Sequence, residues 1–405
     1  ARVVTMADKD GGIIDNAVIL VENDRIKAVG KAGDFPIPAG AKTVDVTGKT
    51  IIPGLVDAHA HGPHGVDEMT PQQNWVNMLN LAMGITTRHD PSSSAATVFP
   101  AVEMQRAGLI VGPRSFSTGE IVYGAKAADV YAEINGLDDA LAHVRRLKAQ
   151  GAHSVKNYNQ PRREQRQQVV AAALQENMRS VAEGGSLFGM DMNLIADGNT
   201  TVEHNVPLDI FYDDVVQFFS KSKVGYTPTL VVTYGGPAGD PYWRAHTDVF
   251  RHSLMAKHYP PAELAANNAR REIAPEEDYV DDNSAREAHK LAKLGVPVSI
   301  GAHGQEAGIA AHWELWSFVR GGMSPIEALA AGTIESARSL GYDKDVGSIA
   351  AGKLADLVVL DADPSADIRN SDKVAKVMIG GRLYDAATLN EEVTGTRKRM
   401  PYYWE

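Results

Sequence analysis

The chain has 405 residues, of which 44% are hydrophobic and 22% are charged. This balance is typical of one large folded domain, alone or with an appendage, and excludes disorder over most of the length. Its 40 basic and 51 acidic residues give a net charge of −11, which disfavours nucleic acid and anionic membranes because both repel an acidic surface. The chain has no cysteine, so disulfides, thiolate metal sites, iron–sulfur clusters and a cysteine nucleophile are excluded.

The chain starts at Ala1 without a methionine and without the basic and apolar segments of a signal peptide. Because Arg2–Met6 already has the pattern of a strand, we expect a processed chain or one cut from a longer precursor. The compartment stays open between the cytoplasm and, for a secreted precursor, the periplasm or the extracellular space. No apolar run approaches the roughly 18 residues of a spanning helix, so membrane insertion is not expected.

Both ends of the chain predict β structure, because short runs rich in Val and Ile alternate with Gly, Asp and Pro. The predicted strands are Arg2–Met6, Ala17–Val21, Ile26–Val29, Thr43–Val46, Asp356–Asp361 and Val374–Ile379. We expect residues 1–52 and 340–390 to meet in one small β-sandwich, with residues 391–405 as a C-terminal tail.

The middle of the chain, residues 53–339, alternates strands with longer helices, which predicts parallel strands joined by helical crossovers. The predicted strands are Gly54–His59, Gly84–His89, Arg114–Thr118, His153–Tyr158, Arg179–Glu183, Thr201–His204, Gly225–Val231 and Pro297–His303. The predicted helices are Gln72–Ala82, Leu137–Ala149, Arg163–Glu176, Leu208–Ser220, Ser284–Leu294 and Pro325–Ala331. Eight strands close a (β/α)8 TIM barrel, whereas an open doubly wound sheet would need a Gly-x-Gly-x-x-Gly that is missing after the first strand. The predicted fold class is therefore α/β, a TIM barrel with a small β-sandwich built from both chain ends.

Polar residues gather where the predicted barrel strands end, which is the face that carries the chemistry of TIM barrels. They are His59, His61, His89, Lys156, Glu183, His204 and His303. His59 and His61 point the same way from an extended strand, so both imidazoles can reach one cation. Together these residues have the composition of a metal site. Taken singly, Lys156 could be a rim lysine that reaches solvent, and His204 could be structural.

This set resembles the amidohydrolase superfamily of metal-dependent hydrolases, which has His-x-His on strand one, Lys on strand four and His on strand six. The segment Val346–Asp361 is similar to the family's return from barrel to sandwich, and with Lys49–His59 it extends the resemblance over nearly the whole chain. Within the superfamily, the sequence looks most like prolidase- and imidazolonepropionase-type members. Given Gly301–Glu306, it especially resembles those fused behind a TolB/WD40-like β-propeller, which implies a propeller ahead of Ala1 in a longer precursor.

The resemblance implies a role for each matching residue. His59 and His61 would bind the more buried metal ion, and His204 would bind a second. Lys156, carboxylated by carbon dioxide, would bridge the two. The implied cofactor is a divalent metal, zinc before others, as one or two ions.

Two positions depart from the family pattern. The family's strand-five histidine, often in His-Ala-Glu, is Val181 here, and Glu183 on the same face could be a substitute ligand, a group that orients a ligand, or a substrate contact. The family's strand-eight aspartate, both ligand and proton shuttle, aligns with His303. Histidine can bind metal and accept a proton at neutral pH, but it brings no negative charge. We expect His303 to be the general base, with Glu183 second, and the number of metal ions stays open.

Substrate contacts are expected from His89, from Tyr123 after strand three, and from Tyr234 in the Gly-rich, aromatic segment Thr233–Trp243, which is typical of a mobile lid. Ordinary packing is the alternative for each of them. Most other histidines lie in loops or polar helices and are expected at the surface: His64, His143, His246, His252, His258 and His289. His312, near Trp313 and Trp316, is expected to pack.

The predicted function is hydrolysis of a C–N bond in an amide, dipeptide-like or cyclic amide substrate by metal-activated water. The same centre could hydrolyse a lactone or a phosphoester. A catalytically silent barrel that serves as a binding module is the alternative of a different class, and metal analysis separates it from the enzymes. Deamination is disfavoured because it usually relies on the strand-eight aspartate. The expected partners are a small-molecule or short-peptide substrate and further copies of the chain in a homo-oligomer.

Overall fold

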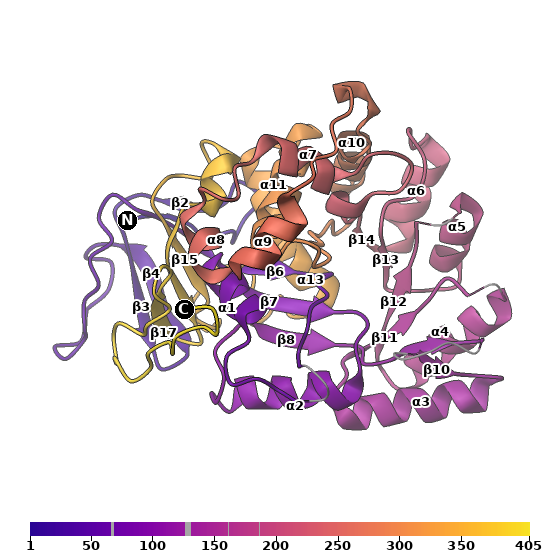
Figure 1. Cartoon of the computed structure of the whole chain (residues 1–405), viewed down its shortest axis with the longest axis horizontal. Coiled ribbons are helices and arrows are strands. Elements are labelled where there is room, and N and C mark those ends of the chain that lie inside the picture. Colours follow the sequence, from indigo (N-terminus) through magenta and orange to yellow (C-terminus); the bar gives the residue numbers. More distant parts are fainter. Residues whose placement is uncertain (66–68, 126–130, 161, 186) are drawn as a thin grey trace.

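The computed structural model describes residues 1–65, 69–125, 131–160, 162–185 and 187–405. Strands from the two chain ends lie side by side at one edge of the molecule, and the rest of the chain forms a barrel beside them (Figure 1). In the described part of the chain, no helix is long and apolar enough to cross a membrane.

The chain ends build a six-stranded sheet in the order β17-β16-β15-β5-β1-β2. Its strands are β1 (Arg2–Val4), β2 (Ile13–Ile14), β5 (Thr50–Pro53), β15 (Leu357–Leu360), β16 (Val374–Ile379) and β17 (Arg382–Asp385), and β3 (Ala17–Glu22) and β4 (Arg25–Lys31) form a separate hairpin. β5 is parallel to β1 and antiparallel to β15, with Pro53 opposite Leu357 and Thr50 opposite Leu360. Apolar side chains from both chain ends pack together here, including Val3, Ile51, Leu357 and Val359.

The predicted strand Thr43–Val46 is wrong, since these residues form no strand. The Asp45 carboxylate accepts hydrogen bonds from the backbone N–H and the hydroxyl of Thr47. This local turn competes with strand pairing.

The barrel strands are β6 (Leu55–Asp57), β7 (Ile85–Asp90), β8 (Arg114–Ser117), β9 (Ile121–Tyr123), β11 (Ser154–Asn157), β12 (Arg179–Glu183), β13 (Thr201–Glu203) and β14 (Gly225–Thr227). β8 pairs with β7 and β9 pairs with β11, so the third position in the barrel is shared between two short strands. A further strand, β10 (Tyr131–Glu133), pairs with β9. All these pairings are parallel.

The eighth position is taken by residues 297–303, which form no continuous strand. Instead, Val298 bridges to Tyr226 of β14 and His303 bridges to Ala60 after β6, and these two bridges close the ring. The α/β barrel with a small sheet from both termini is therefore confirmed. The predicted seventh strand ends early, because Thr229 has a left-handed backbone with φ of 53° and Leu230–Val232 form a 3-10 turn, η1.

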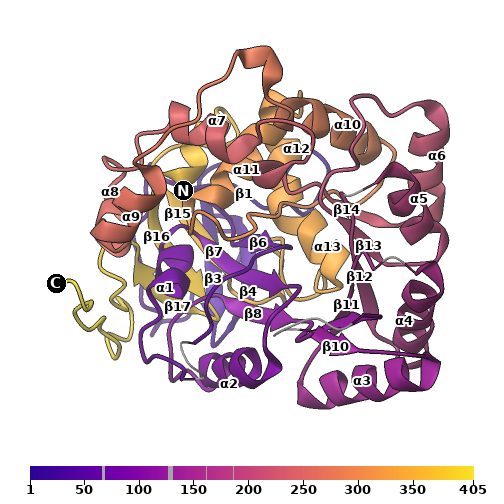
Figure 2. The ribbon, with the colours of Figure 1, turned by 45° about the vertical axis from the view of Figure 1, so that its right-hand side comes forward.

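Helices cover the outside of the barrel, with α2 to α6 on one flank and α7, α10 and α11 on another (Figure 2). The helices are α1 (Trp75–Ala82), α2 (Ala95–Arg106), α3 (Leu137–Gln150), α4 (Arg163–Gln175), α5 (Phe188–Ala196), α6 (Asp213–Ser222), α7 (Gly239–His246), α8 (Ser253–His258), α9 (Pro261–Asn268), α10 (Asp281–Lys293), α11 (Ile309–Arg320), α12 (Pro325–Ala330) and α13 (Ser336–Leu340). Shorter turns are η2 (Glu276–Asp278), η3 (Ala331–Glu335) and η4 (Ile368–Asp372). The segment Thr233–Trp243, expected as a loop, contains the start of α7, whose Trp243 is buried and donates to Ser317 of α11.

Candidate metal centre

Four histidines meet at the C-terminal ends of the barrel strands. One nitrogen from each of His59, His204 and His303 lies within 4.8 Å of the others. His61 joins them, with its Nε2 3.1 Å from His59 Nε2 and its ring centroid 4.8 Å from that of His303. The structure therefore brings together four of the residues predicted as metal ligands.

A carboxylate contacts the Nδ1 atom of each histidine in the His-x-His pair. His59 Nδ1 lies 3.0 Å from Glu203 Oε2, and His61 Nδ1 lies 3.2 Å from Asp90 Oδ1. An imidazole that donates from Nδ1 to a carboxylate presents a lone pair at Nε2, and the two Nε2 atoms face each other. A divalent cation is the group that fits this arrangement. The sequence analysis missed both acids, although each is adjacent in sequence to a strand-end histidine, His204 and His89.

The other two histidines leave their strands by a sharp change of backbone direction. His204 and His303 have φ of 67° and 60°, in the left-handed region that side chains with a Cβ rarely adopt. Backbone bonds from His303 N to His59 O and from His61 N to His303 O hold strand eight against strand one. His303 Nδ1 lies 2.7 Å from Gln305 Oε1, which can only accept, so Nε2 of His303 carries the lone pair.

Lys156 and Glu183 form a buried ion pair beside these histidines. Lys156 is 1% exposed, which rules out a rim lysine that reaches solvent. Glu183 also lies 3.0 Å, through Oε1, from His204 Nε2, at angles outside hydrogen-bond geometry. Burial would raise the pKa of Glu183, but Lys156 and His204 outweigh it and lower that pKa below its usual value. Glu183 is therefore an anion at the edge of the cluster.

Burial sets the charge of the imidazoles. It lowers the pKa of His303 to about 3 and that of His59 well below its ordinary value. Neighbouring histidines add to both shifts, and Lys156 adds to that of His59. These histidines are therefore neutral, which is the form that binds a metal ion. Burial raises the pKa of Glu203 to about 7, against the attraction of Lys156.

The three residues predicted to contact substrate differ in their surroundings. The Tyr234 ring is 45% exposed and lies 5.3 Å, between centroids, from the His204 ring. Tyr123 is half-buried and packs edge-on against Tyr131 and Tyr158. His89 is buried, with its ring nitrogens 2.7 Å from Ser154 Oγ and 3.3 Å from Ala58 O. Both ring nitrogens of His89 therefore have partners inside the protein, which favours packing over contact with substrate.

Gly185 makes room for Tyr234 over the cluster. Its φ is +84°, and a Cβ placed there would lie 2.4 Å from Cε2 of the Tyr234 ring. Asn205 fixes the tyrosine from the other side, because its amide bonds both the backbone N–H and the C=O of Tyr234.

Three histidines expected at the surface are buried instead: His64, His258 and His289. His64 Nε2 lies 2.8 Å from Asp90 Oδ2, and its Nδ1 lies 3.1 Å from Nη2 of Arg88. The sequence did not indicate the contact between His64 and Arg88, because it joins a loop to a strand 24 residues further along the chain.

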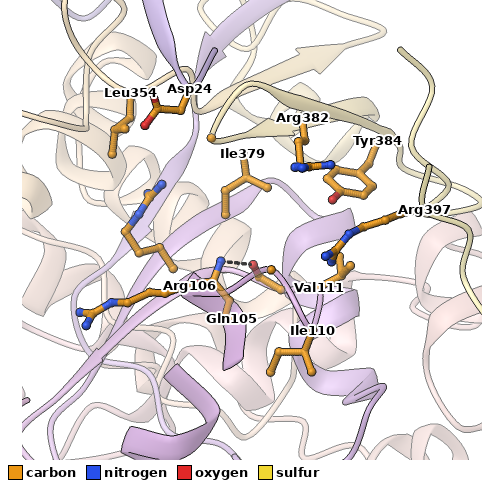
Figure 3. Close-up of a pocket in the computed structure, with 14 residues that line it drawn as sticks. Asp24, Gln105, Arg106, Ile110, Val111, Leu354, Ile379, Arg382, Tyr384 and Arg397 are labelled. Carbon is orange, nitrogen blue, oxygen red and sulfur yellow. Dashed lines mark hydrogen bonds between the residues drawn. The ribbon is translucent and has the colours of Figure 1, made fainter. Parts of the chain in front are cut away.

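A pocket of about 300 Å³ lies elsewhere, where α2, β17 and the C-terminal tail meet. Figure 3 shows Arg382, Tyr384 and Arg397 around it, and Arg114, which also lines it, pairs with Asp356. None of the four clustered histidines lines this pocket, so it is separate from the candidate metal centre.

The chain is similar in sequence and in fold to proteins of known families. A family model described as "Amidohydrolase family" matches residues 50–384. An imidazolonepropionase of Erwinia tasmaniensis is 26% identical, over 88% of this chain and 90% of the relative. A 5-methylthioadenosine/S-adenosylhomocysteine deaminase of Moorella thermoacetica is 23% identical, over 95% of this chain and 90% of the relative. The solved structure of a Xaa-Pro dipeptidase, with methionine bound in its active site, has the same fold at a TM-score of 0.71 and 20% identity, covering 95% of this chain and 98% of that one.

Proposed function

The chain belongs to the amidohydrolase family, and from this premise we propose that it hydrolyses an amide C–N bond, in a dipeptide-like or cyclic substrate, with metal-activated water. The observation that carries the proposal is the pair of Nε2 atoms of His59 and His61, 3.1 Å apart, with a carboxylate behind each ring. Two lone pairs at this distance repel unless a cation or a shared proton lies between them, and the carboxyl groups behind both rings favour the cation.

Three imidazoles would hold the cation: His59, His61 and His204. The fourth, His303, would keep its Nε2 lone pair for the proton, because one lone pair cannot bind a metal ion and a proton at the same time. When bound there, a divalent metal, with zinc the first candidate, lowers the pKa of water and polarises the scissile carbonyl. Glu183 would complete the site with negative charge, and Lys156, once carboxylated, would supply more.

The chain's own residues would move the proton and position the substrate. His303, whose Nε2 is free to accept, would take a proton from the attacking water and deliver it to the leaving nitrogen, with Glu183 as the second candidate. Tyr234, beside His204, and Tyr123, on β9, would contact the substrate from two sides of the strand ends. The Gln305 amide would hold the His303 ring in the orientation that this transfer needs.

The test combines elemental analysis of the purified protein with a substrate panel of dipeptides, cyclic amides, lactones and phosphoesters. We expect bound zinc or another divalent metal and turnover of amides. A chelator should abolish the activity, and added metal should restore it. The double variant His59→Asn/His61→Asn should lose both metal and activity, whereas His246→Asn, at an exposed histidine, should keep both.

The possible outcomes separate the alternatives. Turnover of lactones or phosphoesters alone would reassign the reaction while keeping the metal site. Absence of bound metal, together with no effect of the double variant, would overturn the proposal in favour of a silent binding module.

A further inference from the structure

A buried chain of polar contacts runs outward from His61. His61 Nδ1 meets Asp90 Oδ1 at 3.2 Å, Asp90 Oδ2 meets His64 Nε2 at 2.8 Å, and His64 Nδ1 meets Nη2 of Arg88 at 3.1 Å. The last hydrogen bond of this series runs from Arg88 Nε to Ser115 Oγ, at 3.0 Å. Three elements contribute to the series: the loop after β6, which holds His61 and His64, strand β7 and strand β8.

The arginine fixes the direction of both hydrogen bonds made by His64. A guanidinium only donates, so His64 Nδ1 must accept, and the proton of a neutral His64 ring must sit on Nε2. His64 then donates to Asp90, and the carboxylate, which only accepts, leaves Nδ1 of His61 as the donor. The lone pair of His61 is thereby directed to Nε2, toward His59.

Burial makes this order strict. Arg88 is 0% exposed, Asp90 0% and His64 3%, so solvent cannot supply alternative partners to these groups. His61 is the more exposed member, with 30% of its side chain accessible, and its ring would turn more freely without the chain behind it. A buried arginine whose hydrogen-bond partners are a histidine and a serine also costs desolvation free energy, which a purely structural position would avoid more cheaply with an apolar residue.

We propose that Arg88 and His64 are positioning residues that lock the tautomer and ring orientation of His61 for metal binding. This inference rests on the proposed metal site and goes beyond it, because neither residue contacts the cation. Partners behind metal-binding histidines raise affinity by fixing the ring and its proton.

The experiment measures zinc affinity of the apoprotein by competition with a chelator, so that it does not depend on activity. Arg88→Met and His64→Leu should each weaken binding by roughly 10-fold, at the low end of the range for such partners. His64→Gln should recover most of the affinity, because its amide offers an acceptor to Arg88 and a donor to Asp90. Arg179→Met, at a strand arginine that bonds Ser339 O at the other end of the barrel, serves as the control and should bind zinc normally.

A spectroscopic readout separates positioning from general damage. In apoprotein with ¹⁵N-labelled histidine, the His61 signal, identified by its loss in His61→Asn, should report a proton on Nδ1 in the wild type. His64→Leu should give a mixture of tautomers, and His64→Gln should restore the wild-type signal. Should Arg88→Met fail to fold, the two His64 variants still decide the question.

Each result has one meaning. Wild-type protein that binds no zinc overturns the proposed function itself. Wild-type protein that binds zinc, with equal affinity and an unchanged His61 tautomer in His64→Leu, overturns the positioning role and leaves the metal site intact.

Discussion

At the scale of single residues, His303 is the position where this chain differs most from its family pattern. The imidazole stands where the resemblance implies an aspartate, and its Nε2 faces the cluster while Nδ1 bonds Gln305. His303→Asn should lower kcat by roughly 10²–10⁴-fold, with a much smaller change in KM, because it removes proton transfer and not substrate contact.

Steady-state kinetics on the best amide substrate checks the His303 prediction, together with the metal content of the variant. Gln305→Leu is the companion variant, since it keeps the ring and removes only its orienting bond. Near-normal kcat in metal-loaded His303→Asn would remove His303 from the role of base.

Gly185 tests whether Tyr234 contacts the substrate. Gly185→Ala puts a methyl group where the Tyr234 ring now lies, and the left-handed backbone adds strain. We expect KM to rise by roughly 10-fold, because misplacing a substrate contact by about 1 Å is enough for such an effect. Zinc affinity is measured beside KM, since the added Cβ would also lie 3.0 Å from Cβ of His204. Gly189→Ala, where an added Cβ meets nothing within 4 Å, is the matched control. An unchanged KM in Gly185→Ala would argue against a substrate contact by Tyr234.

At the scale of elements, α11 supports the strand ends from behind through one buried carboxyl. Glu314 accepts from Val231 N at 2.7 Å and from Gly301 N at 3.1 Å, so it holds both the turn after β14 and the eighth barrel position. Burial, only partly offset by these two bonds, raises the pKa of Glu314 well above its ordinary value of 4.5.

This shift predicts how stability depends on pH. The unfolded chain releases the Glu314 proton near pH 4.5, whereas the folded chain retains it to a higher pH, so this group's contribution is full below pH 4.5 and falls as the pH rises. Glu314→Gln should flatten that fall, and it should cost about 1–3 kcal/mol at pH 5 because an amide NH₂ faces one of the two N–H donors.

Urea unfolding at several pH values measures both effects of Glu314→Gln. Glu164→Gln, at an exposed glutamate of α4, is the control and should leave the pH dependence as it is. If the free energy of unfolding of Glu314→Gln changed with pH as it does in the wild type, Glu314 would be charged in the folded state.

The elements also show what a sequence can and cannot predict. The run of Val and Ile in β16 gives its bounds of Val374–Ile379, and the strand-end histidines follow from alternation along short strands. The strand expected at Thr43–Val46 is missing because a side-chain turn at Asp45 outcompetes pairing, which hydrophobicity does not record. Glu203 and Asp90 were missed and His64 was wrongly expected at the surface, because their roles depend on contacts between strands and loops distant in sequence.

At the scale of the whole molecule, two buried histidines join barrel helices to segments near the C-terminus that lie outside the strands of the sheet. His258 of α8 donates to Ala386 O and accepts from Tyr402, and His312 of α11 donates to Met83 O and accepts from Ser371. Both bonding patterns require a neutral ring. Burial lowers the pKa of each to about 4.

Acid should therefore loosen this connection. The unfolded chain protonates these histidines near pH 6.5 and the folded chain only near pH 4, so stability is full above pH 6.5 and is lost as the pH falls toward 4. We expect a loss of ~3 kcal/mol for each histidine over this range.

Calorimetry between pH 7 and pH 4 checks the acid effect, with His258→Gln and His312→Gln each reducing the slope. His143→Gln, on the outer face of α3, should change nothing. Equal slopes in wild type and both buried variants would contradict this explanation.

The pairing of β5 with β15 also has a consequence for biosynthesis. β5 leads through Gly54 directly into β6 and then to His59, but its neighbour Leu357 is translated about 300 residues after Pro53. At the usual pace of translation this interval lasts ~15–60 s. The segment after β6 that holds His59 and His61 therefore leaves the ribosome long before β15 exists, and we expect loading of the proposed cation to be a late event in the maturation of the nascent chain.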